Sequence, residues 1–224
     1  MTILKPFLVI VKSLLFYIFD SFALYNATSP QKNKFELVLL VRQDAIGDFI
    51  MWLDTAKEFR QLFPAKKYKI ILIGNASWCG LADEFPYWDQ VLPIDSKKFK
   101  SFSGYRWGLL RKIKNMRSHI AIQPTFSREF YNGDTIIRAS TALKKVGSVG
   151  DMSNRNWLKK IMSDRWHTEL IPASTNKMTE LERNSEFFQG LSNKPHNLSY
   201  PNIICQGTAS HTEWENREYY VLFP

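Results

Sequence analysis

The chain has 224 residues, 45% of them hydrophobic, which is enough for one α/β domain with a real core plus extensions. Its 30 basic and 21 acidic residues give a net charge of +9, which favours anionic partners such as nucleic acid, acidic lipid or a phosphorylated glycan. The two cysteines, Cys79 and Cys205, form no CxxC pair, and the four histidines lack metal-ligand spacing. We therefore expect reduced structural thiols, a cytoplasmic setting and no metal centre.

The amino-terminal segment, residues 6–25, is apolar and aromatic, but Lys12 and Asp20 interrupt it. It therefore falls short of the roughly 18 to 20 apolar residues of a bilayer span, and a transmembrane helix is not expected. Three interpretations stay open: an amphipathic helix on a membrane surface, a helix packed on the domain, and a poor signal peptide without a clear cleavage pattern. The polar residues 26–34 predict a linker, so residues 1–34 are interpreted as an amphipathic helix and linker.

The sequence is organised around a strand, a tight turn and a helix. Residues 37–41 form an unbroken apolar run, which suits a strand covered on both faces in a parallel sheet. From Ile46 the apolar residues recur at helical spacing, which predicts a helix over 46–63 that ends before Pro64. In an open α/β sheet, a turn of this kind lies at the carboxyl end of the strand, where ligands usually bind.

Asp48 falls in the first turn of this predicted helix. Free backbone N–H groups and the helix dipole keep a carboxylate there ionised, so it can accept a hydrogen bond or a proton. Gly47 leaves room for a ligand to approach the backbone. The alternative is that Asp44 or Asp48 only caps the helix.

Strands and helices continue to alternate along the chain. Strands are predicted at residues 68–74, 90–94, 119–124 and 145–149, and helices at 75–85, 105–116 and 135–143. This alternation is typical of a parallel sheet with flanking helices, so the predicted fold class is α/β and Rossmann-like.

The segment from residue 97 to residue 117 contains eight basic residues and no acidic one. Apolar residues at helical spacing within it predict that the basic side chains project from the opposite face. That face is either simply solvated or an electrostatic surface for an anionic membrane or acceptor. The basic residues are Lys97, Lys98, Lys100, Arg106, Arg111, Lys112, Lys114 and Arg117.

Arg128 follows the predicted strand at 119–124 and should lie at the same sheet edge as Asp48. A guanidinium there can clamp a carboxylate or phosphate with two hydrogen bonds. The alternative is a plain salt bridge to Glu129 or another acid.

Residues 150–176 lack clear periodicity and predict a long connection, a length typical of binding loops. Basic and aromatic residues are mixed in it, among them Arg155 and Trp157, and such a mixture also suits single-stranded nucleic acid. No nucleic-acid-binding motif accompanies them, so no nucleic-acid partner is predicted.

Several stretches, in this order, resemble glycosyltransferase family nine, the ADP-heptose:lipopolysaccharide heptosyltransferases. The first is V-L-L-V-R-Q-D-A-I-G-D at residues 38–48, followed by the amphipathic helix that ends in Phe63-Pro64. Residues 88–93 and 120–128 are similar to later parts of the family's first domain. Residues 178–191, which contain Glu182-Arg183-Asn184, resemble the helix that closes it.

The resemblance implies a two-domain (GT-B type) glycosyltransferase that inverts configuration and needs neither metal nor cofactor. It implies that Asp48 is the catalytic base, and that the donor is a nucleotide sugar, with ADP-heptose expected. Arg42, Gly47 and Arg128 would bind substrate, the two arginines orienting an acidic glycolipid acceptor of the lipopolysaccharide core. The expected location is peripheral, on the cytoplasmic face of the inner membrane.

Under this resemblance, residues 35–194 are the acceptor-side domain, and residues 195–224 cross toward a donor-binding domain whose first strand is 219–224. The chain is then expected to be an amino-terminal half that is inactive alone. A non-catalytic, membrane-associated module that binds an anionic glycolipid is the main alternative. A nucleotide-dependent oxidoreductase is disfavoured, because the glycine-rich fingerprint that it needs after the first strand is missing.

Overall fold

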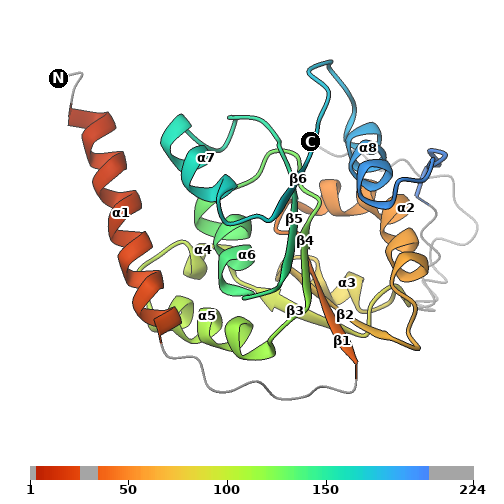
Figure 1. Ribbon diagram of the computed structural model, residues 1–224, viewed down its shortest axis with the longest axis horizontal. Helices are drawn as coiled ribbons and strands as arrows, with labels where there is room; N and C mark the ends of the chain where they lie inside the picture. Colours follow the sequence, from red (N-terminus) through yellow and green to blue (C-terminus); the bar gives the residue numbers. More distant parts are fainter. Residues whose placement is uncertain (1–3, 26–34, 202–224) are drawn as a thin grey trace, which may run out of the picture.

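A computed structural model describes residues 4–25 and 35–201, with side chains described from residue 8 onward (Figure 1). The predicted linker at 26–34, the predicted strand at 219–224 and Cys205 lie outside the described residues. The other cysteine, Cys79, is buried and free.

The described chain forms one parallel six-stranded sheet in the order β3-β2-β1-β4-β5-β6. This confirms the α/β, Rossmann-like prediction. The central strand β1 pairs with β2 and β4, and its last four residues are fully buried, because helices cover both faces of the sheet. The strands are β1 (Glu36–Val41), β2 (Tyr68–Asn75), β3 (Gln90–Ile94), β4 (Ile120–Gln123), β5 (Lys144–Ser148) and β6 (Glu169–Ile171).

Helices pack on both faces of the sheet and divide the core into two (Figure 1). One face is covered by α2 (Ile46–Leu62), α3 (Cys79–Ala82) and α8 (Glu180–Ser192). The other is covered by α4 (Ser96–Phe99), α5 (Gly104–Met116) and α6 (Thr135–Ala139). Successive residues of β1 alternate between the two cores, as the two-residue period of a strand requires.

The predicted helix at 135–143 is shorter in the structure, where α6 ends at Ala139. A π-helix, η1 (Phe130–Asp134), runs directly into α6. π-helical turns are frequent at functional sites. Here the turn directly follows Glu129, in the segment after β4.

The prediction that residues 150–176 form a connection without periodicity is wrong, because they contain α7 (Trp157–Asp164) and β6. Both elements are short, which makes their signals weak. In α7 the apolar residues Trp157, Leu158, Ile161 and Met162 fall at helical spacing, but over only eight residues, and β6 is only three residues long. Trp157 and Ile161 also point outward, with exposed fractions of 63% and 47%.

Helix α1 (Leu4–Tyr25) lies outside these layers, against α5 (Figure 1). The interpretation of a helix packed on the domain is confirmed. By length and composition alone, Leu8–Tyr25 is also apolar enough to cross a membrane, with a mean hydropathy of 1.7. This corrects the expectation that Lys12 and Asp20 make the segment too short for a span.

Not all basic residues of the segment 97–117 project into solvent as predicted. Arg106 and Lys114 are buried. Arg106 Nε and Nη2 donate to the two carboxylate oxygens of Asp20 at 2.7 and 2.6 Å, so the acid that interrupts α1 forms its main bond to α5. The sequence did not reveal this pair because its members are 86 residues apart.

Candidate active site

A cavity of about 340 Å³ opens at the carboxyl ends of β1 and β4. The turn after β1 contributes Asp44 and Asp48, and the segment after β4 contributes Thr125 and Glu129. Glu180, the first residue of α8, closes another side. The cavity thus occupies the sheet edge at which the sequence predicts ligand binding.

Asp48 is a half-buried carboxylate in the first turn of α2 and lines the cavity. The N-cap of α2 is Ala45, without a side-chain hydrogen bond, so neither Asp44 nor Asp48 caps the helix. Among the described residues, Asp48 has no hydrogen-bond or ion-pair partner. Its oxygens are therefore open to a hydroxyl group in the cavity.

Asp44 lies beside Asp48 and is tied to the protein. Thr125 Oγ1 donates to its carboxylate at 3.2 Å, and Arg42 Nε lies 3.0 Å from Oδ2. Burial raises the pKa of Asp44, the charge of Arg42 lowers it, and the charges of Asp48 and Glu129 raise it further, with a net increase. Asp44 therefore holds a proton more readily than an ordinary aspartate does.

Glu180 makes the cavity still more acidic. Burial raises its pKa, Arg42 opposes this, and the charges of Asp44 and Asp48 add to the increase. Glu129 is the fourth carboxylate of the lining, and Lys100 Nζ binds it at 2.7 Å. Among the described residues, the cavity lining therefore carries four carboxyl groups and no basic side chain.

Arg42 lies behind this lining and is fully buried. Its Nη1 donates to Asn184 Oδ1 at 2.8 Å, its Nη2 to Glu180 Oε1 at 2.6 Å, and its Nε faces Asp44. The guanidinium also lies over the Trp52 ring, 5.2 Å from its centroid. In the described structure these contacts occupy Arg42, which links β1 to α8 rather than facing the cavity.

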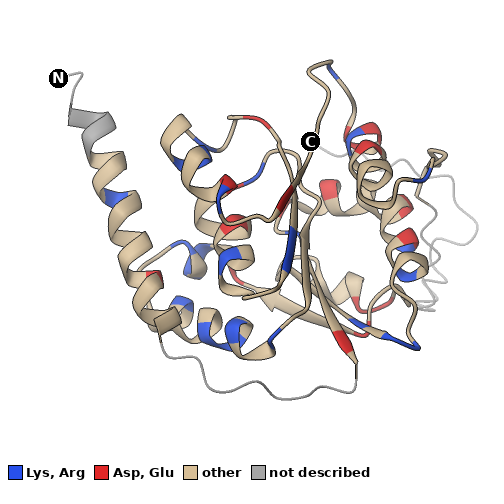
Figure 2. Ribbon diagram, in the orientation of Figure 1, with Lys and Arg blue, Asp and Glu red and all other residues tan. Residues whose placement is uncertain are grey.

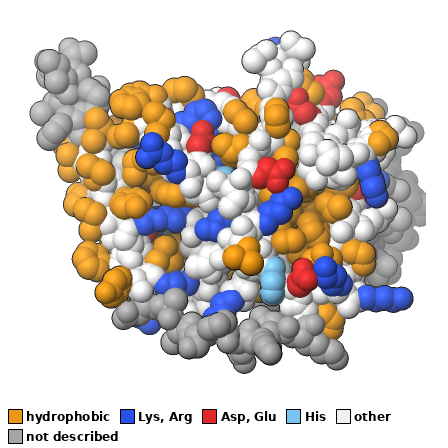
Figure 3. Space-filling model, viewed as in Figure 1, with side chains coloured by type: hydrophobic (Ala, Val, Ile, Leu, Met, Phe, Trp, Pro, Cys, Tyr) orange, Lys and Arg blue, Asp and Glu red, His pale blue; other side chains and the backbone are white. Residues whose placement is uncertain are grey.

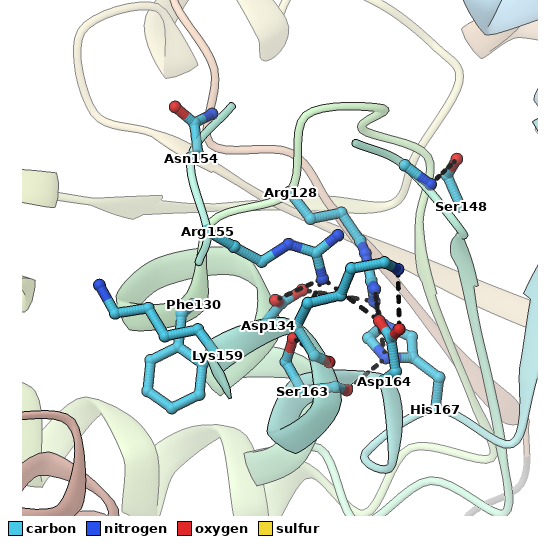
Figure 4. A network of polar contacts seen from close by, with 12 residues as sticks. Arg128, Phe130, Asp134, Ser148, Asn154, Arg155, Lys159, Ser163, Asp164 and His167 are labelled. Carbon is cyan, nitrogen blue, oxygen red and sulfur yellow. Dashed lines mark hydrogen bonds and ion pairs between the residues drawn. The ribbon is translucent and has the colours of Figure 1, made fainter. Parts of the chain in front are cut away.

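Arg128 is also buried, in a network of two arginines and two aspartates (Figure 4). It pairs with Asp134 at 3.5 Å and with Asp164, and Arg155 binds the same two acids at 3.4 and 3.3 Å. The plain salt-bridge interpretation of Arg128 is confirmed, although its partners are these acids and not Glu129. Arg128 is not among the residues that line the cavity, and a substrate-binding role for it stays a prediction.

His167 completes the network (Figure 4). Burial lowers its pKa to about 4, and the charge of Arg128 contributes to the decrease. The ring is therefore neutral at pH 7. Its Nδ1–H donates to the carbonyl oxygen of Ser163 at 3.0 Å, and its Nε2 accepts from Arg128 Nη1 at 3.1 Å. This buried network anchors the loop before α7, and Asn154 of that loop lines the cavity.

Gly47 is the second residue of α2 and is exposed. Its φ is not positive, so the turn does not require glycine at this position. A Cβ at this position would meet no protein atom within 4 Å. The backbone is therefore open to a ligand, and a binding role for Gly47 stays a prediction.

Several lining residues were missed by the sequence analysis. Gln123 is the last residue of β4 and Thr125 lies two residues after it, so the rule that ligands bind at carboxyl strand ends could have found them. Asn154 and Glu180 come from distant segments with no local signal. Among the residues described in the structure, no group of three or more His, Cys, Asp or Glu side chains could hold a metal ion.

The fold and the cavity define a Rossmann-like domain with a candidate ligand site at the carboxyl edge of its sheet. No protein-family model and no curated protein matches the sequence. Among solved structures, the chain is similar to Escherichia coli heptosyltransferase WaaC with ADP-2-deoxy-2-fluoro heptose, with TM-score 0.56 and 13% identity over 74% of this chain and 51% of that chain.

Two further solved structures are similar. One is the glycosyl transferase family 9 protein from Veillonella parvula DSM 2008, with TM-score 0.58 and 14% identity over 80% of this chain and 48% of that one. The other is E. coli ADP-heptose lps heptosyltransferase II, with TM-score 0.52 and 13% identity over 76% and 47%. The chain spans about half the length of each protein. At these identities the likeness establishes a shared fold, and it is the fold of the family that the sequence resembles.

Proposed function

We propose that this chain provides the acceptor-side domain of an inverting, metal-independent glycosyltransferase. The reaction would move a sugar, heptose being our choice, from a nucleotide sugar such as ADP-heptose to a lipopolysaccharide core or related glycan. The observation that carries the proposal is Asp48, a carboxylate without a protein partner among the described residues, in a cavity at the carboxyl edge of a fold shared with heptosyltransferases.

In the proposed reaction, an acceptor hydroxyl enters the cavity and donates a hydrogen bond to Asp48. The hydroxyl oxygen attacks the anomeric carbon of the donor sugar while its proton passes to the Asp48 carboxylate. The bond from that carbon to the diphosphate breaks, and the nucleoside diphosphate leaves with the bonding electrons. Asp48 suits the role of base because its carboxylate lines the cavity and has no protein partner among the described residues.

The lining suggests how the acceptor is held. Asp44 and Glu180 have raised pKa values and can exchange hydrogen bonds with sugar hydroxyls, as donors when protonated and as acceptors otherwise. A phosphate would be repelled by four carboxyl groups. We therefore propose that a neutral part of the acceptor enters the cavity and that its anionic groups stay outside. Arg42 and Arg128 then support the site from behind.

The exposed apolar face of α1 favours a second function, a membrane-associated module that holds a glycolipid without transferring sugar. The two functions differ in what Asp48 does. Transfer requires a proton acceptor at this position, whereas binding requires at most a hydrogen bond.

The test is Asp48→Asn in the protein that carries this chain, assayed by nucleoside diphosphate release in the presence of an acceptor. The expected loss in kcat is about 10²- to 10⁴-fold with little change in thermal unfolding. Asp83→Asn is the matched control, because Asp83 is an exposed carboxylate at the end of α3, outside the cavity lining. Near-normal turnover of Asp48→Asn would refute the base role, and unaltered acceptor binding without any wild-type turnover would favour the binding module.

A further inference from the structure

Helix α1 is held on the domain by polar contacts along its inner side. Ser13 Oγ lies 2.9 Å from the hydroxyl of Tyr131, and Asp20 forms its two-bond pair with Arg106. The hydroxyl of Ser21 accepts a hydrogen bond from the guanidinium of Arg138. The helix is thus fixed in one rotational orientation, with its acid and its two serines directed toward the protein.

The outer side of α1 is apolar. Most surface helices turn polar residues outward, but here large hydrophobic side chains recur on the exposed side over four turns. Phe22 is 66% exposed and Leu15 is 51% exposed. The exposed members are Leu8, Val9, Leu14, Leu15, Tyr17, Ile18, Phe22 and Tyr25, which we call the outer face of α1.

Helix α7 presents a second exposed apolar pair beside α1. Trp157 and Ile161 lie one turn apart and are largely exposed. The two helices approach each other at Tyr131, because the amino groups of Lys12 and Lys159 both lie over its ring, at 5.5 and 4.5 Å from the centroid. Figure 3 shows hydrophobic side chains gathered over this flank, with basic side chains between them.

On this flank the acidic side chains are paired inside the protein and basic side chains face the solvent. The carboxylates of α1 and α7, Asp20 and Asp164, are bound to arginines inside the protein. Lys12 is exposed, and α5 exposes Arg111 and Lys112 and contains no acid (Figure 2). The outward charge of the three helices is therefore positive, which complements an anionic surface.

We infer that the outer face of α1 lies in the interfacial layer of an anionic lipid bilayer and that α7 contacts the same surface. An exposed apolar helix face bordered by cations is the pattern of an interfacial helix, in which apolar burial and attraction to acidic lipid add together. The helix lies along the membrane, because a crossing α1 would leave Asp20 in hydrocarbon without Arg106.

This inference is independent of the proposed function, because lipid binding needs no turnover. Under the proposed function it has one consequence. Asn154 lines the cavity and precedes α7 by three residues, so the cavity opening would lie near the lipid surface. A lipid-anchored acceptor could then reach Asp48 while its apolar part stays in the bilayer.

The test uses the full chain and sedimentation with vesicles of phosphatidylethanolamine and phosphatidylglycerol. The variant combines Leu15→Gln, Ile18→Gln and Phe22→Gln, which changes only exposed side chains of the outer face. We expect wild-type binding that weakens with salt, and a loss on the order of 10- to 100-fold in partitioning for the variant. Phosphatidylcholine vesicles should bind the wild type more weakly.

The matched control is Leu198→Gln with Tyr200→Gln. Both residues are exposed, and they flank Ser199, whose backbone N–H donates to Asp54 of α2 on the other side of the sheet. The control should bind vesicles like the wild type. Equal binding of the triple variant, or no binding of the wild type to anionic vesicles, would overturn the inference.

Two other occupants of this face have distinct signatures. Resistance of the bound protein to alkaline carbonate extraction would show a spanning helix and overturn the surface orientation. A stable dimer in sedimentation velocity that the triple variant abolishes, without vesicle binding, would show that a second copy covers the face and would also overturn it.

Discussion

The ion pair between Asp20 and Arg106 should be essential for docking α1. Both side chains are almost completely buried, and two hydrogen bonds of 2.7 and 2.6 Å join them. Replacing Asp20 with Ala leaves the guanidinium buried without its counter-charge, and the loss of one partner of a buried pair costs about 3 to 5 kcal/mol.

The loss should fall near the lower end of that range. Arg106 Nη1 keeps two carbonyl acceptors, Phe99 O at 2.6 Å and Tyr131 O at 2.9 Å, and so stays partly satisfied. We expect Asp20→Ala to lower the free energy of unfolding by about 3 kcal/mol. If α1 detaches instead, its amide protons should exchange freely while the sheet keeps its protection.

The assay is urea unfolding followed by circular dichroism, combined with hydrogen exchange. A double-mutant cycle with Arg106→Met isolates the coupling between the two side chains. Lys112→Met is a control, because Lys112 is an exposed cation of the same helix. A coupling below about 1 kcal/mol, typical of a solvent-exposed pair, together with unchanged exchange in α1, would refute the idea that this pair docks the helix.

Three further predictions concern the candidate site and its support. Arg42→Met should lower the free energy of unfolding by about 3 to 5 kcal/mol, because it leaves Glu180 and Asp44 without their counter-charge. Normal stability with weakened acceptor binding would instead support a substrate-binding role for Arg42. The pKa of His167 is about 4 in the folded protein against 6.5 in the unfolded chain, so the unfolded chain binds the proton more tightly. The free energy of unfolding should therefore fall by about 3 kcal/mol as the pH is lowered from 6.5 to 4. His167→Gln should remove this component from pH-dependent unfolding curves. Gly47→Ala should raise the free energy of unfolding by up to about 1 kcal/mol, because the position is helical and a Cβ has room there. If a ligand approaches this backbone, the same substitution should slow sugar transfer. Unchanged transfer kinetics would show that Gly47 is not part of the site.

The β1–turn–α2 unit can be predicted from sequence because its signals are local. The apolar run before Arg42 and the helical spacing after Ile46 lie in adjacent stretches, and both elements form at the expected residues. The position of Asp48 at the carboxyl edge of the sheet follows directly from that unit.

The support of the site cannot be predicted in this way, because its contacts are long-range. Arg42 meets Asn184 across 142 residues, and Arg128 meets His167 across 39. A basic residue at a strand end looks the same in sequence whether it faces a ligand or a buried acid. Only packing decides between the two, and it turns both arginines inward.

The surface of helix α1 is also poorly predicted from sequence, because it depends on a long-range contact. Lys12 and Asp20 look like interruptions of an apolar segment, and that view gives no reason to pair Asp20 with Arg106. Once the acid is placed inside, the remaining surface of α1 is more apolar than the sequence suggests. The predicted peripheral membrane contact therefore remains a proposal, now with a defined face to test.

The most direct measurement of the proposed function is a structure of the protein that carries this chain, bound to an acceptor saccharide and a non-hydrolysable donor analogue. We predict an acceptor hydroxyl within about 2.6 to 3.2 Å of an Asp48 carboxylate oxygen. The hydroxyl oxygen should lie between Asp48 and the anomeric carbon of the donor. An acceptor bound outside the cavity, or one whose hydroxyls all lie beyond hydrogen-bonding reach of Asp48, would contradict the proposal.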